Sequence, residues 1–405
     1  MIKEISGGVC APSGFTASGI HCGLSKNPDK NDLALIYSEK RAAAAAVYTT
    51  NLVKGAPLLV TKENIADGYA KAIICNSVNA NTCNADGIEK AKEICAAAAA
   101  GIKADPADIV SASTGVIGQR LDAAPIKAGI PALVSSLSKE GSDAACRAIM
   151  TTDTVKKEIA VEFEIGGKVC RMGGIAKGSG MIHPNMATML CFITSDVNIS
   201  PEMLDKILKE DIPNTFNMVT VDGDTSTNDM VVILSNAMAE NEELTCEGEA
   251  ADAFAQALDH VMVYLSRSIA KDGEGATKLL ECTAKGAKDK ETAKTAAKAI
   301  VSSSLFKAAM FGADANWGRA LCAIGYSGAD VDISRIGVSF KNEAGEVTVC
   351  ENGAGVDFSE EKAKEILLGD EIKILVTLGD GAGCATAWGC DLTYDYVKIN
   401  GSYRS

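Results

Sequence analysis

The sequence has few of the residues on which the commonest catalytic and metal sites depend. Its 405 residues include only three histidines, His21, His183 and His260, and its 14 cysteines form no Cys-x-x-Cys pair. A zinc site of the usual Cys/His type therefore lacks a ligand cluster. A Ser-His-Asp or Cys-His enzyme would have to use one of these three histidines. Most cysteines lie in apolar runs, as Cys75 and Cys191 do, which predicts reduced thiols in the core.

Positive charge and long apolar runs are also scarce. The chain has 39 Lys and Arg against 53 Asp and Glu, a formal charge of −14, which disfavours binding to nucleic acid or to an anionic membrane. The longest nearly uncharged apolar stretch, Ile94–Ile102, is about half the length of a membrane span. The N-terminal residues do not have the basic start and apolar core of a secretory signal. We expect a cytoplasmic protein.

The length favours two to three domains, and β-branched runs that alternate with helical patterns predict a layered α/β architecture. Gly166-Gly167, between two alternating segments, predicts a hairpin, and the polar stretch 284–291 predicts a domain boundary. Strands are expected at 33–37, 45–49, 72–76, 109–112, 159–165, 189–194, 230–234, 337–340, 347–350, 372–378 and 386–399. Helices are expected at 85–99, 126–137, 201–210, 249–269, 292–309, 317–324 and 360–367.

Three motifs resemble cofactor or metal loops but have the wrong spacing. Gly173–Gly180 is not a Walker loop, because its lysine precedes the glycine and Gly178 is followed by Ser179. Gly379–Gly383 lacks the third glycine of a dinucleotide site. Asp222–Asp229 lacks the glycine and the glutamate that a calcium loop requires. The residues thus predict no bound metal and no nucleotide cofactor.

The segment Lys177–Leu190 is unusual, because a glycine-rich approach leads directly into an apolar strand. Thr188 stands at the start of that strand, after the small residue Ala187. A hydroxyl can attack the carbonyl of its own preceding peptide bond if that bond is strained and accessible. Cleavage would give Thr188 a free α-amine that could act as the base for its own hydroxyl. An ordinary junction of loop and strand has the same pattern, so the residues alone leave both interpretations open.

Motifs along the whole chain resemble the ornithine acetyltransferase family, the bifunctional arginine-biosynthesis enzymes also called glutamate N-acetyltransferases. The segment Lys177–Leu190 resembles the self-cleavage motif of that family. Eight further blocks occur in the same order, at 47–57, 76–81, 113–118, 150–154, 220–229, 272–278, 311–319 and 391–400. The resemblance implies a layered α-β-β-α fold of the self-processing N-terminal-nucleophile type, with a smaller C-terminal α/β domain from about residue 285.

The resemblance also implies a reaction. Cleavage between Ala187 and Thr188 would give an α chain, residues 1–187, and a β chain, residues 188–405, which associate as a heterotetramer of two of each. Thr188 would accept the acetyl group of N-acetylornithine, release ornithine and pass the acetyl group to glutamate. Thr114 and Gly115 would stabilise the oxyanion, although Ser-Thr-Gly is also a common turn sequence. No cofactor is implied, and acetyl-CoA is open as a second acetyl donor.

The substrate-binding residues implied by the resemblance come from several parts of the chain. Lys177 can pair with the α-carboxylate and Glu274 with the side-chain ammonium of ornithine, although both sequence contexts are also typical of solvated side chains. Thr152 adjoins Thr151, and the sequence does not distinguish their hydroxyls. The family usually ends in threonine, whereas this chain ends in Ser405, which keeps the hydroxyl. The implied set is Thr151, Lys177, Thr188, Glu274, Asn400 and Ser405.

Two other functions compete with acetyl transfer. A self-processing aminopeptidase or amidohydrolase of the same fold would form the same acyl-enzyme and lose the acyl group to water. A binding or assembly protein would never cleave itself.

Overall fold

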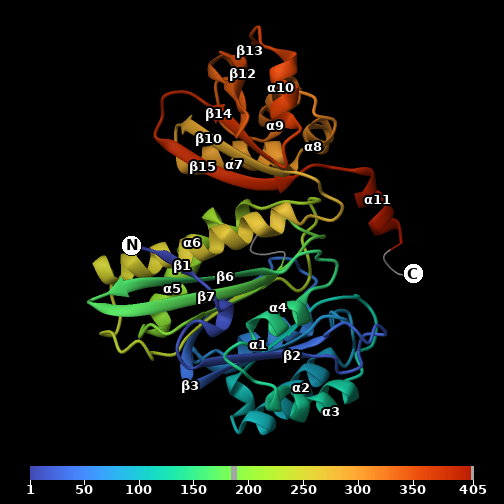
Figure 1. The fold of residues 1–405 in the computed structure, drawn as a ribbon, viewed down its shortest axis with the longest axis vertical. Coiled ribbons are helices and arrows are strands. Elements are labelled where there is room, and N and C mark those ends of the chain that lie inside the picture. The colour runs from blue at the N-terminus through green and yellow to red at the C-terminus, as the bar shows by residue number, and fades with distance from the viewer. Residues whose placement is uncertain (184–188, 403–405) are drawn as a thin grey trace. The chain divides into compact units, whose positions relative to one another are not determined.

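The computed structural model describes residues 1–183 and 189–402, and it divides the chain into two units (Figure 1). The first unit consists of Met1–Gly178, Pro184–Pro213 and Thr225–Leu265. The second unit consists of Ser179–His183, Asn214–Asp224 and Ser266–Ser405. Residue 285, where the sequence predicts a domain boundary, lies inside a strand of the second unit.

The first unit is built on a nine-stranded sheet with the order β1-β6-β7-β8-β9-β3-β4-β5, and β2 pairs with β3. Its 16-residue strand β3 joins the two parts of the sheet, because residues 33–37 pair with β4 and residues 43–48 pair with β9. The strands are β1 Lys3–Ile5, β2 Phe15–Ile20, β3 Leu33–Tyr48, β4 Tyr69–Asn76, β5 Ile109–Ser113, β6 Lys157–Ile165, β7 Lys168–Lys177, β8 Leu190–Ser195 and β9 Met230–Ser235.

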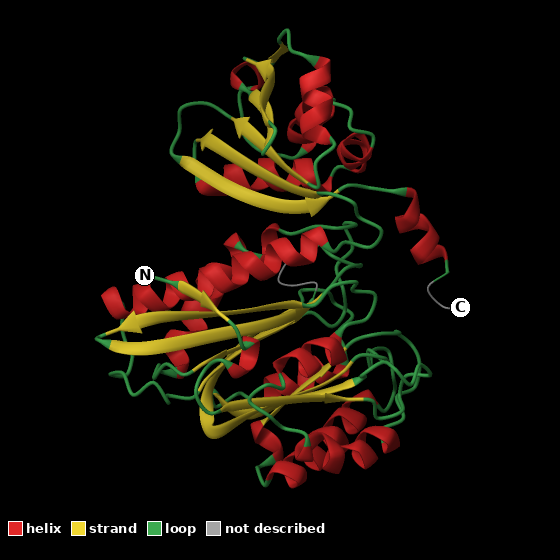
Figure 2. Ribbon diagram, viewed as in Figure 1, coloured by secondary structure: helices red, strands yellow, loops and turns green. Residues whose placement is uncertain are grey.

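Helices α2, α3 and α6 cover the outer faces of the two parts of this sheet, and an apolar core that includes α4 fills the space between their inner faces. Successive strand residues point to opposite faces, so Leu35 packs with α2 and α3 while Ile36 joins an inner core with Phe192. Val261, on α6, lies over Gly174 of β7. The predicted α-β-β-α layering is confirmed (Figure 2). The helices are α1 Ala56–Asn64, α2 Gly87–Ile102, α3 Ala124–Ser135, α4 Ser142–Ile149, α5 Pro201–Asp211 and α6 Glu249–Lys271.

The second unit has a six-stranded sheet with the order β13-β12-β11-β14-β10-β15, and α7 packs on β10 and β15. The strands are β10 Leu279–Ala287, β11 Gly337–Asn342, β12 Gly345–Glu351, β13 Ala354–Gly355, β14 Glu371–Thr377 and β15 Gly383–Cys390. The helices are α7 Lys290–Ser302, α8 Ser304–Phe311, α9 Trp317–Tyr326, α10 Glu360–Leu367 and α11 Tyr394–Gly401. Short 3-10 turns in the two units lie at Gly8–Cys10, Pro106–Asp108, Ile212–Asn214, Phe216–Met218 and Ile333–Arg335.

The predicted hairpin is confirmed, whereas the predicted strand at 386–399 is wrong beyond Cys390. Ile165 faces Lys168 across the Gly166-Gly167 turn, where both glycines have positive φ, as a type I′ turn requires. The chain after Cys390 instead forms helix α11. The alternation of tyrosines there was misleading because Tyr394 and Val397 are 84% and 70% exposed, so no apolar face is buried in a sheet.

The cysteines and the helices have the properties that the sequence predicts, namely reduced thiols, most of them in the core, and no apolar stretch of the length of a membrane span. All 14 cysteines lie in the described residues and are free thiols, and nine of them are buried. Burial raises the pKa of the Cys75 thiol to about 12, so the thiol is neutral. None of the helices in the described parts of the chain is long and apolar enough to cross a membrane.

The inner core predicts a clear difference between two substitutions in the same sheet. Phe192 is 1% exposed in β8, so Phe192→Ala should lower the free energy of unfolding by about 3–5 kcal/mol through lost burial and a residual cavity. Val169 is 57% exposed in β7, and Val169→Ala should cost less than about 1 kcal/mol. Urea unfolding followed by circular dichroism measures both, and equal losses would contradict this packing.

Candidate active site

The loop after β5 carries Thr114 and Gly115, the predicted oxyanion pair. β4 and β5 are parallel, and their pairing continues past the strand ends. The Thr114 N–H donates to the Asn76 carbonyl at 3.0 Å, and the Val116 N–H donates to the Val78 carbonyl at 3.0 Å. No described residue accepts a hydrogen bond from the Gly115 N–H between them. The loop is therefore fixed by its neighbours while one donor is free.

The conformation of this loop requires glycine at position 115. Gly115 has φ of 124°, and an added Cβ would lie 2.1 Å from the Val78 carbonyl oxygen. The adjacent Thr114 hydroxyl lies 3.5 Å from Lys177 Nζ, from which it accepts a long hydrogen bond, so its own proton is free to donate. Two half-buried donors on adjacent residues form the kind of pair that stabilises a tetrahedral oxyanion.

The Asn228 side chain also stabilises the loop that carries Thr114 and Gly115, which we call the oxyanion loop. Its Nδ2 donates to the carbonyls of Ser113, at 2.9 Å, and Ala80, at 2.6 Å. Its Oδ1 accepts from the hydroxyls of Thr82 and Thr227, each at 2.6 Å. Asn228 is only 5% exposed, and these hydrogen bonds satisfy both the nitrogen and the oxygen of its buried side-chain amide. Sequence reasoning missed this role, because it rests on contacts between distant segments.

A buried carboxylate, Asp153, connects two predicted substrate-binding residues. Its side chain is fully buried and accepts hydrogen bonds from the Thr151 N–H at 3.0 Å and the Gly178 N–H at 2.7 Å. Lys157 Nζ forms an ion pair with it at 2.7 Å. Lys177, at the end of β7, is 8% exposed. Sequence reasoning did not identify Asp153, although it lies in the block 150–154.

The charges around Asp153 leave Lys177 without an acidic partner of its own. Burial alone would raise the pKa of the Asp153 carboxyl, but the charges of Lys177 and Lys157 and the hydrogen bond from Gly178 outweigh burial and lower the pKa to about 2. Lys177 forms no ion pair with any described residue. Among the described residues, no carboxylate therefore forms an ion pair with Lys177, and its positive charge suits a substrate carboxylate.

In the second unit, two of the predicted substrate-binding residues, Glu274 and Asn400, contact each other. Asn400 Nδ2 donates to Glu274 Oε2 at 2.7 Å, and the Glu274 N–H donates to the Ser179 carbonyl at 2.8 Å. A Cβ at Gly180 would lie 2.3 Å from the Glu274 carboxyl carbon, so only glycine fits below it. Glu274 is 8% exposed, and none of the described lysines, arginines or histidines pairs with it. A buried carboxylate of this kind suits an ammonium group.

The residues that lead to the predicted cleavage site are held by Asp222. Its carboxylate accepts from the N–H groups of Met181, at 2.6 Å, and Ile182, at 2.8 Å, and from the Tyr396 hydroxyl at 3.3 Å. Met181 has φ of 56°, a strained conformation for a non-glycine residue. Tyr396 and Asn400 lie one turn apart on α11, so the helix, and not the expected strand, presents both side chains to this region.

His183 is half-buried and contacts the Thr220 side chain. Its Nδ1 lies 3.0 Å from the Thr220 hydroxyl, and burial lowers its pKa to about 4. It is therefore neutral at pH 7. No group of three or more His, Cys, Asp or Glu side chains suited to a metal ion occurs within residues 1–183 and 189–402.

The structure thus brings the predicted site residues together in two groups, one in each unit. Three predicted residues, Ala187, Thr188 and Ser405, lie outside the described residues. The group of the first unit is Thr114, Gly115, Thr151 and Lys177, and the group of the second unit is Glu274 and Asn400.

Comparison with known proteins identifies the family. The profile of the ArgJ family matches residues 16–405. An arginine biosynthesis bifunctional protein ArgJ of Caldanaerobacter subterraneus subsp. tengcongensis is 50% identical over 405 residues, all of both chains. Its counterpart in Bacillus subtilis is 46% identical over 406 residues, covering 100% of this chain and 98% of the relative. The chain belongs to the ArgJ family.

One solved structure agrees with this membership, and a second is also similar in sequence. The crystal structure of the arginine biosynthesis bifunctional protein ArgJ of Bacillus halodurans is 47% identical with a TM-score of 0.51, and it matches 53% of this chain and 100% of its own. An ornithine acetyltransferase of Mycobacterium tuberculosis, complexed with ornithine, is 33% identical with a TM-score of 0.43, over 46% of this chain and 100% of its own. The family predicted from the motifs is confirmed, and with it an enzyme of arginine biosynthesis.

The depressed pKa of Asp153 predicts how stability depends on pH. Because the folded-state pKa is about 2 against an ordinary value of 3.8, the ionised carboxylate contributes stability above about pH 4 and loses it as pH falls toward 2. Asp153→Asn should therefore lower the free energy of unfolding by about 2 kcal/mol or more at pH 7, and the deficit should shrink toward pH 3.

Chemical denaturation of both proteins across this pH range measures the difference. Asp29→Asn, at an exposed position of the same unit, serves as a control and should leave stability nearly unchanged at every pH. A deficit for Asp153→Asn that does not vary with pH would contradict the assignment.

Proposed function

We propose that the chain transfers the acetyl group of N-acetylornithine to glutamate through an acetyl ester on Thr188. The observation that carries this proposal is the free Gly115 N–H and Thr114 hydroxyl beside the unpaired Lys177 cation, in a chain of the ArgJ family. An oxyanion site next to a carboxylate-binding cation suits acyl transfer from an N-acyl amino acid.

The nucleophile requires a cleavage between Ala187 and Thr188. The residues before this bond are anchored by Asp222, and after it the Met189 carbonyl accepts from the Met230 N–H at 2.9 Å. The solved Bacillus halodurans chain matches 53% of this chain over its full length, close to the share of residues 188–405. Both facts support a chain that functions as two fragments.

In the proposed reaction, the α-amine of Thr188 takes the proton of its own hydroxyl while Oγ attacks the acetyl carbonyl. The oxyanion receives hydrogen bonds from Thr114 and Gly115. The C–N bond breaks, the proton passes to the departing α-amine of ornithine, and the acetyl ester remains. The α-amine of glutamate then attacks the ester, and N-acetylglutamate leaves as Thr188 Oγ recovers a proton.

The substrate contacts in this proposal are those that the resemblance to the family implies. Lys177 would pair with the α-carboxylate, and Glu274, oriented by Asn400, would receive the side-chain ammonium of ornithine. Thr151 would add a hydroxyl, which has no partner among the described residues. Ser405, at the C-terminus, would be a further substrate-binding residue.

This mechanism needs no metal or cofactor. The word bifunctional in the names of the relatives supports acetyl-CoA as a second acetyl donor. The two fragments would form a heterotetramer in the cytoplasm.

Thr188→Ala tests the nucleophile. The wild-type protein should separate into fragments of about 19 and 23 kDa, and N-terminal sequencing of the larger one should read Thr-Met-Leu-Cys-Phe. Thr188→Ala should remain one inactive chain of 41.9 kDa. A cleaved Thr188→Ala protein would refute the assignment, and an uncleaved wild-type protein without transferase activity would favour a binding protein that does not process itself.

The acceptor distinguishes transferase from hydrolase. Acetylornithine should show ping-pong kinetics with glutamate, and the acetyl group should be trapped on the N-terminal peptide of the larger fragment. Consumption of acetylornithine at the same rate without glutamate would identify an aminopeptidase or amidohydrolase instead.

Thr114→Val tests the oxyanion site. Because an oxyanion donor acts mainly in the transition state, kcat should fall about 10²–10³-fold while KM changes little. Thr114→Ser keeps the hydroxyl and should recover most of the activity. Steady-state kinetics separates the two constants, and a raised KM at unchanged kcat would reject the role of Thr114.

A further inference from the structure

The two amino acids of the proposed reaction differ in charge. Both carry an α-carboxylate, but ornithine ends in an ammonium group and glutamate in a second carboxylate. Lys177 accounts for one carboxylate and Glu274 for the ammonium. A site that accepts glutamate needs a second cation, because an unpaired carboxylate is costly to remove from water.

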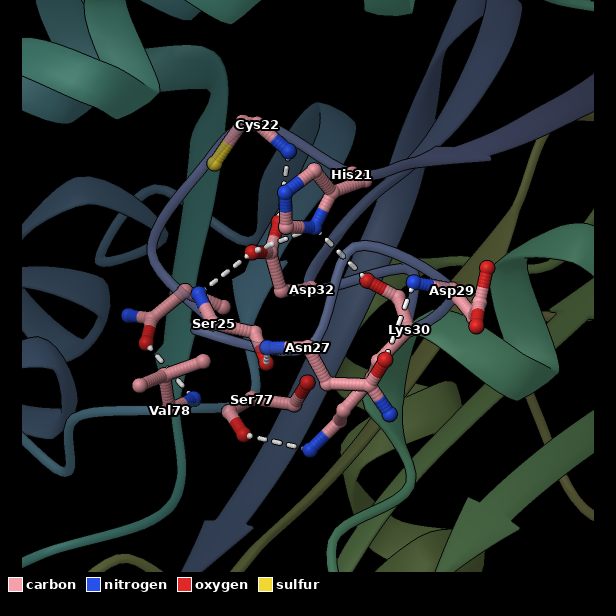
Figure 3. Close-up of polar contacts among 10 residues, drawn as sticks. His21, Cys22, Ser25, Asn27, Asp29, Lys30, Asp32, Ser77 and Val78 are labelled. Atoms are coloured by element: carbon pink, nitrogen blue, oxygen red, sulfur yellow. Dashed lines mark hydrogen bonds and ion pairs between the residues drawn. The ribbon is translucent and has the colours of Figure 1, made fainter.

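The loop between β2 and β3 places such a cation in the first unit (Figure 3). Asp32, which is fully buried, accepts from the N–H groups of Cys22 and Ser25, each at 2.7 Å. His21 Nδ1 lies 2.9 Å from the Lys30 carbonyl and 3.3 Å from Asp32. These contacts fix the backbone of the loop, and therefore the position from which Lys30 extends.

The Lys30 side chain reaches the segment that supports the oxyanion loop. Its Nζ donates to the Ser77 carbonyl at 3.3 Å (Figure 3). Ser77 lies between Asn76 and Val78, whose carbonyls accept from the N–H groups of the oxyanion loop. Lys30 and the oxyanion loop therefore form hydrogen bonds with the same short segment, residues 76–78 of the first unit.

The charges near Lys30 leave it free to bind an anion. Burial, followed by the charge of Lys177, lowers the pKa of Lys30. Asp32 and Asp153 are the acidic groups that oppose this effect, and both are already engaged, Asp32 by its loop and Asp153 by Lys157. Lys30 is half-buried and has no ion pair with any of the described carboxylates.

We propose that Lys30 forms a second carboxylate subsite, which receives the side-chain carboxylate of the acceptor glutamate. This inference rests on the proposed function and extends it to the choice of acceptor. Lys177 holds the α-carboxylate that both amino acids share, and Lys30 distinguishes a side chain that ends in carboxylate from one that ends in ammonium or amide.

Acceptor selectivity tests the subsite. With acetylornithine as donor, kcat/KM is measured for glutamate and for glutamine, whose amide replaces the side-chain carboxylate. Lys30→Met should lower kcat/KM for glutamate about tenfold or more and lower that for glutamine much less, so that the preference for glutamate collapses. Lys30→Arg keeps the charge and should retain most of the preference. Lys26→Met removes the same charge from an exposed position in the loop and should behave as wild type.

Each other outcome has a distinct meaning. If Lys30→Met lowers the constants for glutamate and glutamine equally, Lys30 only supports the loop and the subsite is refuted. An unchanged preference for glutamate would also refute it. If the wild-type enzyme releases ornithine but transfers no acetyl group to glutamate, the proposed function fails instead.

Discussion

The site of the first unit depends on the pairing of two short segments beyond the ends of β4 and β5. Buried backbone groups must be paired, and the carbonyls of Asn76 and Val78 satisfy the N–H groups on both sides of Gly115. The Gly115 N–H itself has no partner among the described residues, and only glycine fits the conformation that produces this arrangement. Asn228 and Lys30 attach to the same pair of segments from other parts of the chain. A shift of this pairing would therefore displace the Gly115 N–H and the Thr114 hydroxyl. The ammonium groups of Lys30 and Lys177, which contact these segments, would lose their present contacts as well.

Buried charges are the second constraint on the site of the first unit. One of them, Asp153, stabilises the fold, and another, Lys177, is available to bind a ligand. Asp153 joins Lys157 in a closed pair and fixes the backbone of Thr151 and Gly178, so this carboxylate is used entirely within the fold. Lys177 stays close enough to lower the pKa of Asp153 without forming an ion pair with it. The ammonium group of a lysine without an ion pair can still pair with a ligand, whereas a lysine in a closed salt bridge is already paired.

Local patterns in the sequence predicted most strands, most long helices and the Gly166-Gly167 hairpin, because these depend on neighbouring residues. The motifs also predicted site roles for Thr114, Gly115, Lys177, Glu274 and Asn400, and these roles stay predictions. Contacts between distant segments were not predictable in this way. Asn228 forms hydrogen bonds with Thr82 and Ser113, which are 146 and 115 positions away in the sequence. Contacts at such separations produce no local pattern that a single sequence could show. Helix α11 was missed because four alternating residues fit a strand as well as a helix, and only burial distinguishes them.

The proposed reaction requires the protein to bind side chains of opposite charge in turn. One fixed charge cannot favour both, because a group that attracts the ammonium of ornithine repels the second carboxylate of glutamate. Among the described residues, Glu274 in the second unit is a buried carboxylate without an ion pair, and Lys30 in the first unit, like Lys177, is a cation without one. Neutralising either group inside the fold would stabilise the protein but would remove the preference for one of the two substrates. The unpaired charges are therefore best understood as a cost in stability that selectivity requires.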